Sequence, residues 1–227
     1  TLSSYYIGDY LFGVKIDSGT YDDGGVDYIS DTGWFVSIPD KVLSDTENYQ
    51  TIIDNESTWG YWTASFKDST NVIDHISHYS TWVAGVETSS DIIDQYMIDD
   101  STFSFNGHMI GAVNTSGTLD AIKFDTNNNL TLNFDFGSNE DFSGSFNFDT
   151  VAGQNWQGNI NPVAGSLTNT DFSSTDNVSS TVADMTITSS SINGKYYGTD
   201  EIKSVGGNFE FNTSSSKAFG SFKADKQ

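Results

Sequence analysis

The sequence has no cysteine, no arginine and only two prolines among its 227 residues. Without cysteine the chain forms no disulfide and holds no thiolate metal site. It also has no uninterrupted apolar run of about 18 residues, the length that a membrane-spanning helix requires. Nine lysines face 31 aspartates and glutamates, so the formal net charge is −22. Because such a surface repels phosphate groups, the composition predicts no binding to nucleic acid or to anionic membrane surfaces.

Aromatic residues are plentiful, with 16 Phe, 11 Tyr and 5 Trp. Many alternate with polar residues, as in segments 130–136 and 142–148, which a five-residue polar turn connects. A period of two indicates strands with one buried face, and a short turn between them indicates a hairpin. Helical signal is confined to residues 89–97, where Ser89 or Ser90 is the expected N-cap. Further strands are predicted at 5–16, 34–38, 59–66, 82–86, 102–113, 156–160 and 182–188.

Successive hairpins with one apolar face predict an all-β fold of roughly eight to ten short strands, closed into an antiparallel up-and-down barrel, in which about eight strands give an interior that side chains can fill. A β-sandwich is the competing architecture, because the strand pattern does not establish closure. We expect residues 1–55 to form a small N-terminal β segment, either a separate handle-like sheet or a strand packed on the barrel. Residues 56–227 are then the barrel domain.

The C-terminal segment combines glycines with aromatic residues in three predicted strands. Glycine inside a strand indicates a bulge, a bend or the close approach of another backbone, all of which a tightly wound barrel needs. The three segments read Gly-Lys-Tyr-Tyr-Gly at 194–198, Val-Gly-Gly-Asn-Phe at 205–209 and Ala-Phe-Gly-Ser-Phe at 218–222.

This ending resembles that of the transferrin-binding protein B-like β-barrel family, which includes surface lipoproteins and hemophilin-like haem binders. The segments Trp59–Trp62 and Trp82–Gly85 are also similar to parts of related bacterial surface domains. The resemblance implies an eight-stranded barrel, an extracellular or bacterial cell-surface location and a binding role without catalysis. The ligand it implies is a host protein or haem, and it transfers no individual ligand contact to this chain.

Two histidines three residues apart, His75 and His78, form the sharpest chemical feature. Neutral imidazoles on a loop or helical turn can ligate a metal or a haem iron, with His108, expected on a strand beside Gly107, as a third candidate. The alternative is a polar loop without a ligand. A possible calcium site comprises Asp22, Asp23 and Asp27 around a glycine turn; an acidic turn without a metal is the alternative.

The aromatic residues Trp59, Tyr61, Trp62 and Trp82 are a candidate binding platform, with barrel core as the alternative. No nucleophile elbow, zinc-protease motif or phosphate-binding glycine loop occurs, so we predict no enzymatic activity. The sequence therefore predicts an acidic binding module that captures an unknown protein or a small ligand. The competing hypothesis is a structural domain of an adhesin, surface layer or fibre that self-assembles through its N-terminal strand.

Overall fold

The computed structural model describes residues 2–7, 11–16, 20–23, 26–38, 56–67 and 73–227, with side chains for residues 56, 57, 59–61 and 80–227. The chain divides into two compact units, Thr1–Asp54 with Thr58–Thr81, and Asn55–Ser57 with Trp82–Gln227. This division differs from the predicted boundary at residue 56. The difference arises because β5 (Ser57–Lys67) and β6 (Ile73–Gly85), assigned to the barrel from sequence, belong to the N-terminal sheet.

The first unit is a six-stranded sheet in the order β1-β2-β4-β5-β6, with β3 paired to β4. The predicted strand 5–16 is in fact two strands that pair antiparallel, with Tyr5 opposite Gly13. The predicted strand 34–38 is the end of a longer one, β4. The remaining strands of this sheet are β1 (Leu2–Ile7), β2 (Leu11–Ile16), β3 (Thr20–Asp23) and β4 (Val26–Ile38).

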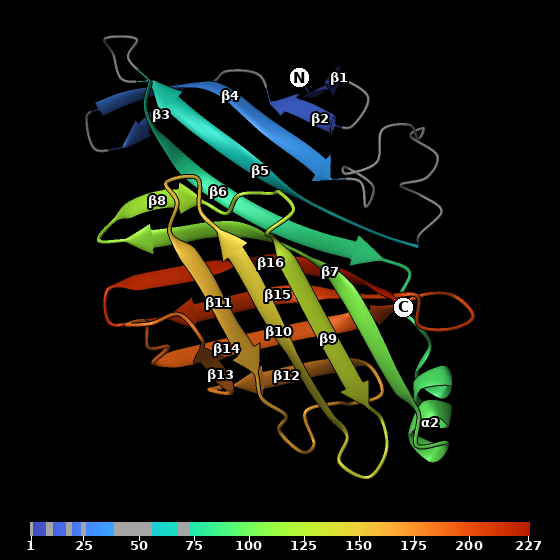
Figure 1. The fold of residues 1–227 in the computed structure, drawn as a ribbon. Coiled ribbons are helices and arrows are strands. Elements are labelled where there is room, and N and C mark those ends of the chain that lie inside the picture. The colour runs from blue at the N-terminus through green and yellow to red at the C-terminus, as the bar shows by residue number, and fades with distance from the viewer. Residues whose placement is uncertain (1, 8–10, 17–19, 24–25, 39–55, 68–72) are drawn as a thin grey trace. The chain divides into compact units, whose positions relative to one another are not determined.

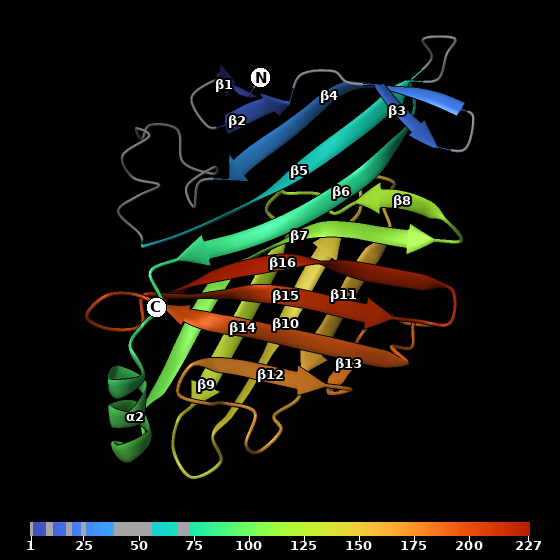
Figure 2. The ribbon, with the colours of Figure 1, turned by 180° about the vertical axis from the view of Figure 1, so that it is seen from behind.

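The second unit is a ten-stranded antiparallel sheet with helix α2 (Ser90–Ile98) at one end (Figure 1). Strands β9 to β11 form its near wall in Figure 1, and β14 to β16 form the near wall in the reverse view of Figure 2. The strands are β7 (Thr102–Thr115), β8 (Thr118–Ala121), β9 (Asn129–Asp135), β10 (Asp141–Asp149), β11 (Asn155–Ile160), β12 (Asp171–Thr175), β13 (Val178–Ser180), β14 (Ser189–Tyr197), β15 (Ser204–Asn212) and β16 (Ser216–Lys226).

The sheet is nearly closed into a barrel, because its two edge strands, β12 and β13, are consecutive parts of one chain segment. Asp176 separates them with a positive φ of 56°, so the first half pairs with β14 and the second half with β11. The break is held by the Asp176 N–H, which donates to the Ser190 carbonyl at 2.9 Å, and by the Ser190 N–H, which donates to Asp176 Oδ1 at 3.1 Å. With β12 and β13 counted as one and β8 as a side branch of β7, the barrel has the predicted eight strands in up-and-down order.

Paired glycines allow the barrel wall to bend sharply. Gly207 lies opposite Gly194, and Gly220 lies opposite Gly111. A Cβ atom on Gly207 would lie 1.9 Å from the carbonyl oxygen of Asn193, and one on Gly220 would lie 1.9 Å from that of Ile110. Neighbouring backbones therefore approach too closely for any side chain, which explains the recurrence of glycine in the C-terminal strands.

The barrel interior is filled by aromatic side chains that stack on one another. Phe134 contacts Phe172 edge-on with ring centroids 4.9 Å apart, and Phe146 stacks on Phe211 at 4.7 Å. Eight strands enclose a space that side chains can fill completely, and here they do. The largest fully buried side chains are Trp156, Tyr196, Phe105, Phe134, Phe136, Phe142, Phe146, Phe148, Phe172, Phe211, Phe222 and Ile93.

One predicted strand is wrong. Residues 182–188 form no strand; Met185 and Ile187 instead pack against the core from a connecting segment that begins with a turn, in which the Met185 N–H donates to the Val182 carbonyl. The helix is present with Ser89 at its N-cap, but the Ser89 side chain makes no capping hydrogen bond. Among the described helices, none is both long and apolar enough to cross a membrane.

Candidate binding groove on the barrel wall

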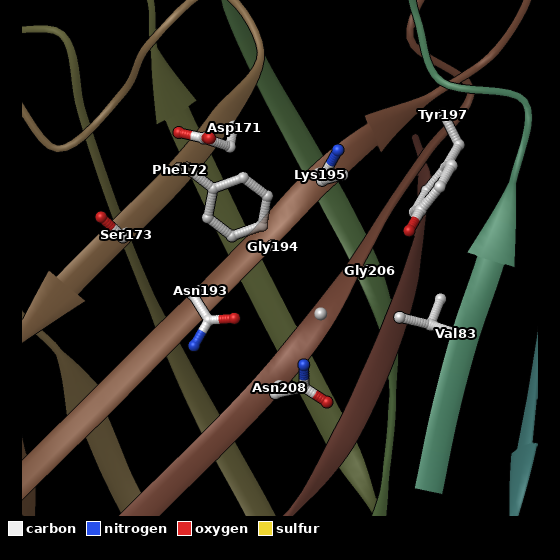
Figure 3. A pocket seen from close by; sticks show the side chains of 11 residues that line it. Val83, Asp171, Phe172, Ser173, Asn193, Gly194, Lys195, Tyr197, Gly206 and Asn208 are labelled. Carbon is white, nitrogen blue, oxygen red and sulfur yellow. The ribbon is translucent and has the colours of Figure 1, made fainter.

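A groove of about 370 Å³ lies on the outer face of β12, β14 and β15, shown in Figure 3. Because side chains alternate across a strand, Phe172 and Tyr196 fill the core while their neighbours Asp171, Ser173 and Tyr197 face the groove. The volume is within the range of about 300–1,000 Å³ that is usual for small-ligand sites.

The strand register arranges the groove residues in rows. One row runs across three strands as Ser173, Asn193 and Asn208, each directly opposite the next. The adjacent row places Lys195 opposite Gly206, which has no side chain. A Cβ atom on Gly206 would lie 2.7 Å from Val83 Cγ2 and 3.4 Å from Tyr197 Cε2, so the absence of a side chain there lets Val83 and Tyr197 pack closely over this strand.

Tyr197 lies beyond Gly206 and is only 4% exposed. Its hydroxyl has no hydrogen-bond partner among the described residues, and it points into the groove toward Val83 (Figure 3). Burial, reinforced by the nearby Glu87 carboxylate, raises the pKa of Tyr197 to about 12. The side chain is therefore a neutral hydrogen-bonding group over the whole physiological range, and it is already positioned by its packing.

The charged residues beside the groove are already engaged. Lys195 Nζ forms an ion pair with Glu87 Oε1 at 2.7 Å. Asp171 Oδ1 accepts a hydrogen bond from Thr168 Oγ1 at 2.8 Å. In contrast, the side chains of Ser173 and Asn193 make no hydrogen bond within the described residues. The groove thus offers free groups that are polar but uncharged.

The histidines are placed differently from the expected loop. His75 and His78 lie within β6, and their side chains are outside the described part of the chain. His108 lies on β7 beside Gly107, as expected, and its Nδ1 is 2.5 Å from the Asn128 carbonyl oxygen. Among the described side chains, no group of three or more His, Asp or Glu is placed to hold a metal ion. A haem or metal site at these histidines stays a prediction.

The other sequence candidates are only partly described. Asp22 and Asp23 lie on β3 and Asp27 on β4, with Asp22 opposite Asp27 in the ladder, but their side chains are outside the described residues. The calcium site therefore also stays a prediction.

Of the aromatic platform, Trp59 is 2% exposed, Tyr61 and Trp82 are partly buried, and the Trp62 side chain is outside the described residues. Use of these aromatic residues for binding remains a prediction, as does the alternative that they are core.

Sequence reasoning missed the groove, although a signal was present. Tyr196 and Tyr197 are adjacent in a strand, so one ring must face outward when the other faces the core. Gly206 and Gly207 are adjacent in the next strand, so one of them lacks a side chain on the outer face and lets a neighbouring side chain pack closely there, as Val83 does over Gly206. An outward tyrosine beside an outward glycine therefore indicates an irregular outer wall at this point.

No protein-family model and no curated protein matches the chain. Solved structures do match, among them intact Ap-TbpB with its N and C lobes. That alignment covers 98% of this chain with a TM-score of 0.52 and 15% sequence identity. The chain has a TbpB-like barrel fold. It spans only 39% of the length of Ap-TbpB, and at this identity the likeness shows the fold alone.

Proposed function

We propose that this chain is a non-catalytic binding module, secreted or displayed on a bacterial surface, that captures a host protein. The observation that carries this proposal is the TbpB-like barrel fold combined with an aromatic-filled interior. A barrel filled to its centre has no room for an internal ligand, so its ligand is bound on the outer wall or on loops. The groove of Figure 3 is the described outer-wall feature best suited to this role.

The test uses the purified chain and two named probes, iron-loaded transferrin and haemin. Saturable binding of transferrin by calorimetry, weakened by changes in the groove, is the expected result. Transferrin is the first probe because the C-terminal strands resemble those of the transferrin-binding protein B-like family. A folded chain that binds neither probe at micromolar concentration would refute capture of this type.

Haemin tests the histidine hypothesis separately. A Soret band that appears on mixing and is lost in the His75→Ala/His78→Ala double variant would identify haem as the ligand. A Soret band that survives the double variant would exclude these two histidines as its ligands.

The second candidate function is structural assembly through the N-terminal strand. Among the described strands, β1 pairs with β2 alone, so it lies at the edge of its sheet. An edge strand has backbone N–H and C=O groups available for pairing with another chain. Polymerisation that stops when residues 1–16 are deleted would support this function, and a monomer at all concentrations would refute it.

A further inference from the structure

The groove of Figure 3 has features that exclude several classes of ligand. Its floor strands, β14 and β15, are each paired on both sides, β14 with β12 and β15, and β15 with β14 and β16. Their backbone groups are used within the barrel. An extended peptide therefore cannot bind here by adding a strand, which needs a free edge.

Charged ligands are disfavoured because the charged groups beside the groove are engaged. The Lys195 ammonium is 2.7 Å from Glu87, and the Asp171 carboxylate accepts a hydrogen bond from Thr168. A purely apolar ligand is disfavoured because, although Val83 and Phe172 line the groove, such a ligand would leave the hydroxyl and amide groups beside them without partners.

The groups that remain free are neutral and carry both donors and acceptors. They are the Tyr197 and Ser173 hydroxyls, the Asn193 amide and the Nδ2 of Asn208, whose Oδ1 accepts from Ser221 at 2.9 Å. The Tyr197 hydroxyl is the most informative of them, because a side chain that is 96% buried normally has a partner for its polar atom. Here that partner position lies in the groove.

We propose that this groove binds a neutral sugar residue of a glycan. Each hydroxyl of a sugar is both a donor and an acceptor, which matches hydroxyl and amide groups that can serve in either role. Asn193, Asn208 and Tyr197 line the same groove, whose wall beside Tyr197 is closed by Val83 packed over Gly206, and one sugar ring there contacts both the asparagine row and the tyrosine. This inference rests on the proposed binding function and names the chemistry that its outer-wall site recognises.

The test applies the full chain to an array of defined glycans. The array carries neutral N-linked and O-linked glycans, their sialylated or sulfated forms, and neutral bacterial polysaccharide fragments. The neutral forms are expected to bind and their charged forms to bind more weakly. Whether the glycoprotein glycans or the bacterial fragments bind identifies the source. No binding to any neutral glycan, or a preference for the charged forms, would overturn the proposal.

The strongest neutral oligosaccharide is then titrated by calorimetry against variants. Tyr197→Phe removes one hydroxyl while keeping the buried ring, and Asn193→Ala removes one amide from the row. Each is expected to weaken binding about two- to tenfold, the effect of one neutral hydrogen bond. Asn159→Ala is the matched control, because Asn159 is an exposed asparagine on β11, outside the groove. Equal effects of Asn193→Ala and Asn159→Ala, or unchanged affinity in Tyr197→Phe, would place the sugar elsewhere.

Enzymatic removal of glycans from transferrin separates this inference from the proposed function. Binding of transferrin that survives deglycosylation, with no neutral glycan bound on the array, would overturn the sugar site and keep protein capture. Binding of neutral glycans without binding of transferrin would keep the sugar site and overturn transferrin capture.

Discussion

Alanine at Gly207 should be among the most damaging single substitutions in the barrel. The new Cβ would lie 1.9 Å from the carbonyl oxygen of Asn193 and 2.5 Å from the Cα of Gly194. Ordinary carbon contacts begin at about 3.5 Å, so two hydrogen-bonded strands would have to separate by more than about 1 Å. Both obstacles are backbone atoms, which no rotamer change can move.

The expected magnitude follows from this geometry. Overpacking costs about 1–3 kcal/mol, and a clash with backbone belongs at the upper end of that range. For a chain of this size each kcal/mol lowers Tm by roughly 2–4 °C, so Gly207→Ala should lower Tm by about 6–12 °C. Thermal unfolding followed by circular dichroism measures the shift, and urea unfolding gives the free energy independently.

Gly153→Ala is the control for this prediction. Gly153 has a φ of 89° but nothing within 4 Å of its would-be Cβ. Alanine there introduces only backbone strain, about 1 kcal/mol. If the two variants melt at the same temperature, the close approach of β14 and β15 is not what requires glycine at position 207.

Two further predictions concern ionised groups. Glu56 has a pKa below its usual value, because its side chain accepts hydrogen bonds from Lys203 and from the Thr199 N–H, while the pKa of Lys203 is raised chiefly by the same pair. Because the pKa of Glu56 is lowered, its carboxylate contributes stability above pH 4.5, and this stability is lost on acidification. Because the pKa of Lys203 is raised, its ammonium contributes stability below pH 10.5, and this stability is lost as the pH rises further. The urea midpoint of Glu56→Gln should therefore depend less on pH at both ends than that of the unchanged chain, and parallel profiles would contradict the pairing. Asp141 lies opposite Asp135 in the β9–β10 ladder, and burial followed by that like charge raises its pKa. Asp141→Asn should thus raise the urea midpoint at pH 7 by the equivalent of up to about 0.5 kcal/mol. No gain is expected at pH 3, where the carboxyl is protonated. A loss of stability at pH 7 would contradict repulsion between Asp141 and Asp135.

The barrel was predictable where a strand has one buried and one exposed face. The alternation in β9 and β10 records this directly, with Phe134 and Phe142 buried and Asn133 exposed. The break at Asp176 was not predictable, because Thr-Asp-Asn is also the composition of an ordinary turn. What makes it a bend in a continued strand is its pairing with two distant strands, β14 and β11, which local sequence does not record.

The failed strand at 182–188 has a related cause. Alternating apolar residues report burial on one side but do not report backbone pairing. Met185 and Ile187 pack against the core, so the apolar pattern was correctly identified, yet the segment forms no strand; at its end the Thr188 N–H donates to the Asn212 carbonyl at 2.8 Å. The domain boundary at residue 56 stays a prediction, although β5, which has good strand signal, belongs to the N-terminal sheet.

The large negative net charge also says little about how the groove recognises a ligand. Each of the six lysines in residues 82–227 forms an ion pair with a carboxylate, including Lys123 with Asp125 at 2.6 Å and Lys217 with Glu210 at 2.8 Å. The barrel therefore has no lysine free to attract an anion, and the groove's own free groups are uncharged. Because salt screens charges but scarcely affects neutral hydrogen bonds, binding in the groove should change little between low and high ionic strength. Docking of a basic partner on the acidic surface would instead weaken steeply with salt, so the ionic-strength dependence of any ligand distinguishes recognition by the groove from attraction by the net charge of −22.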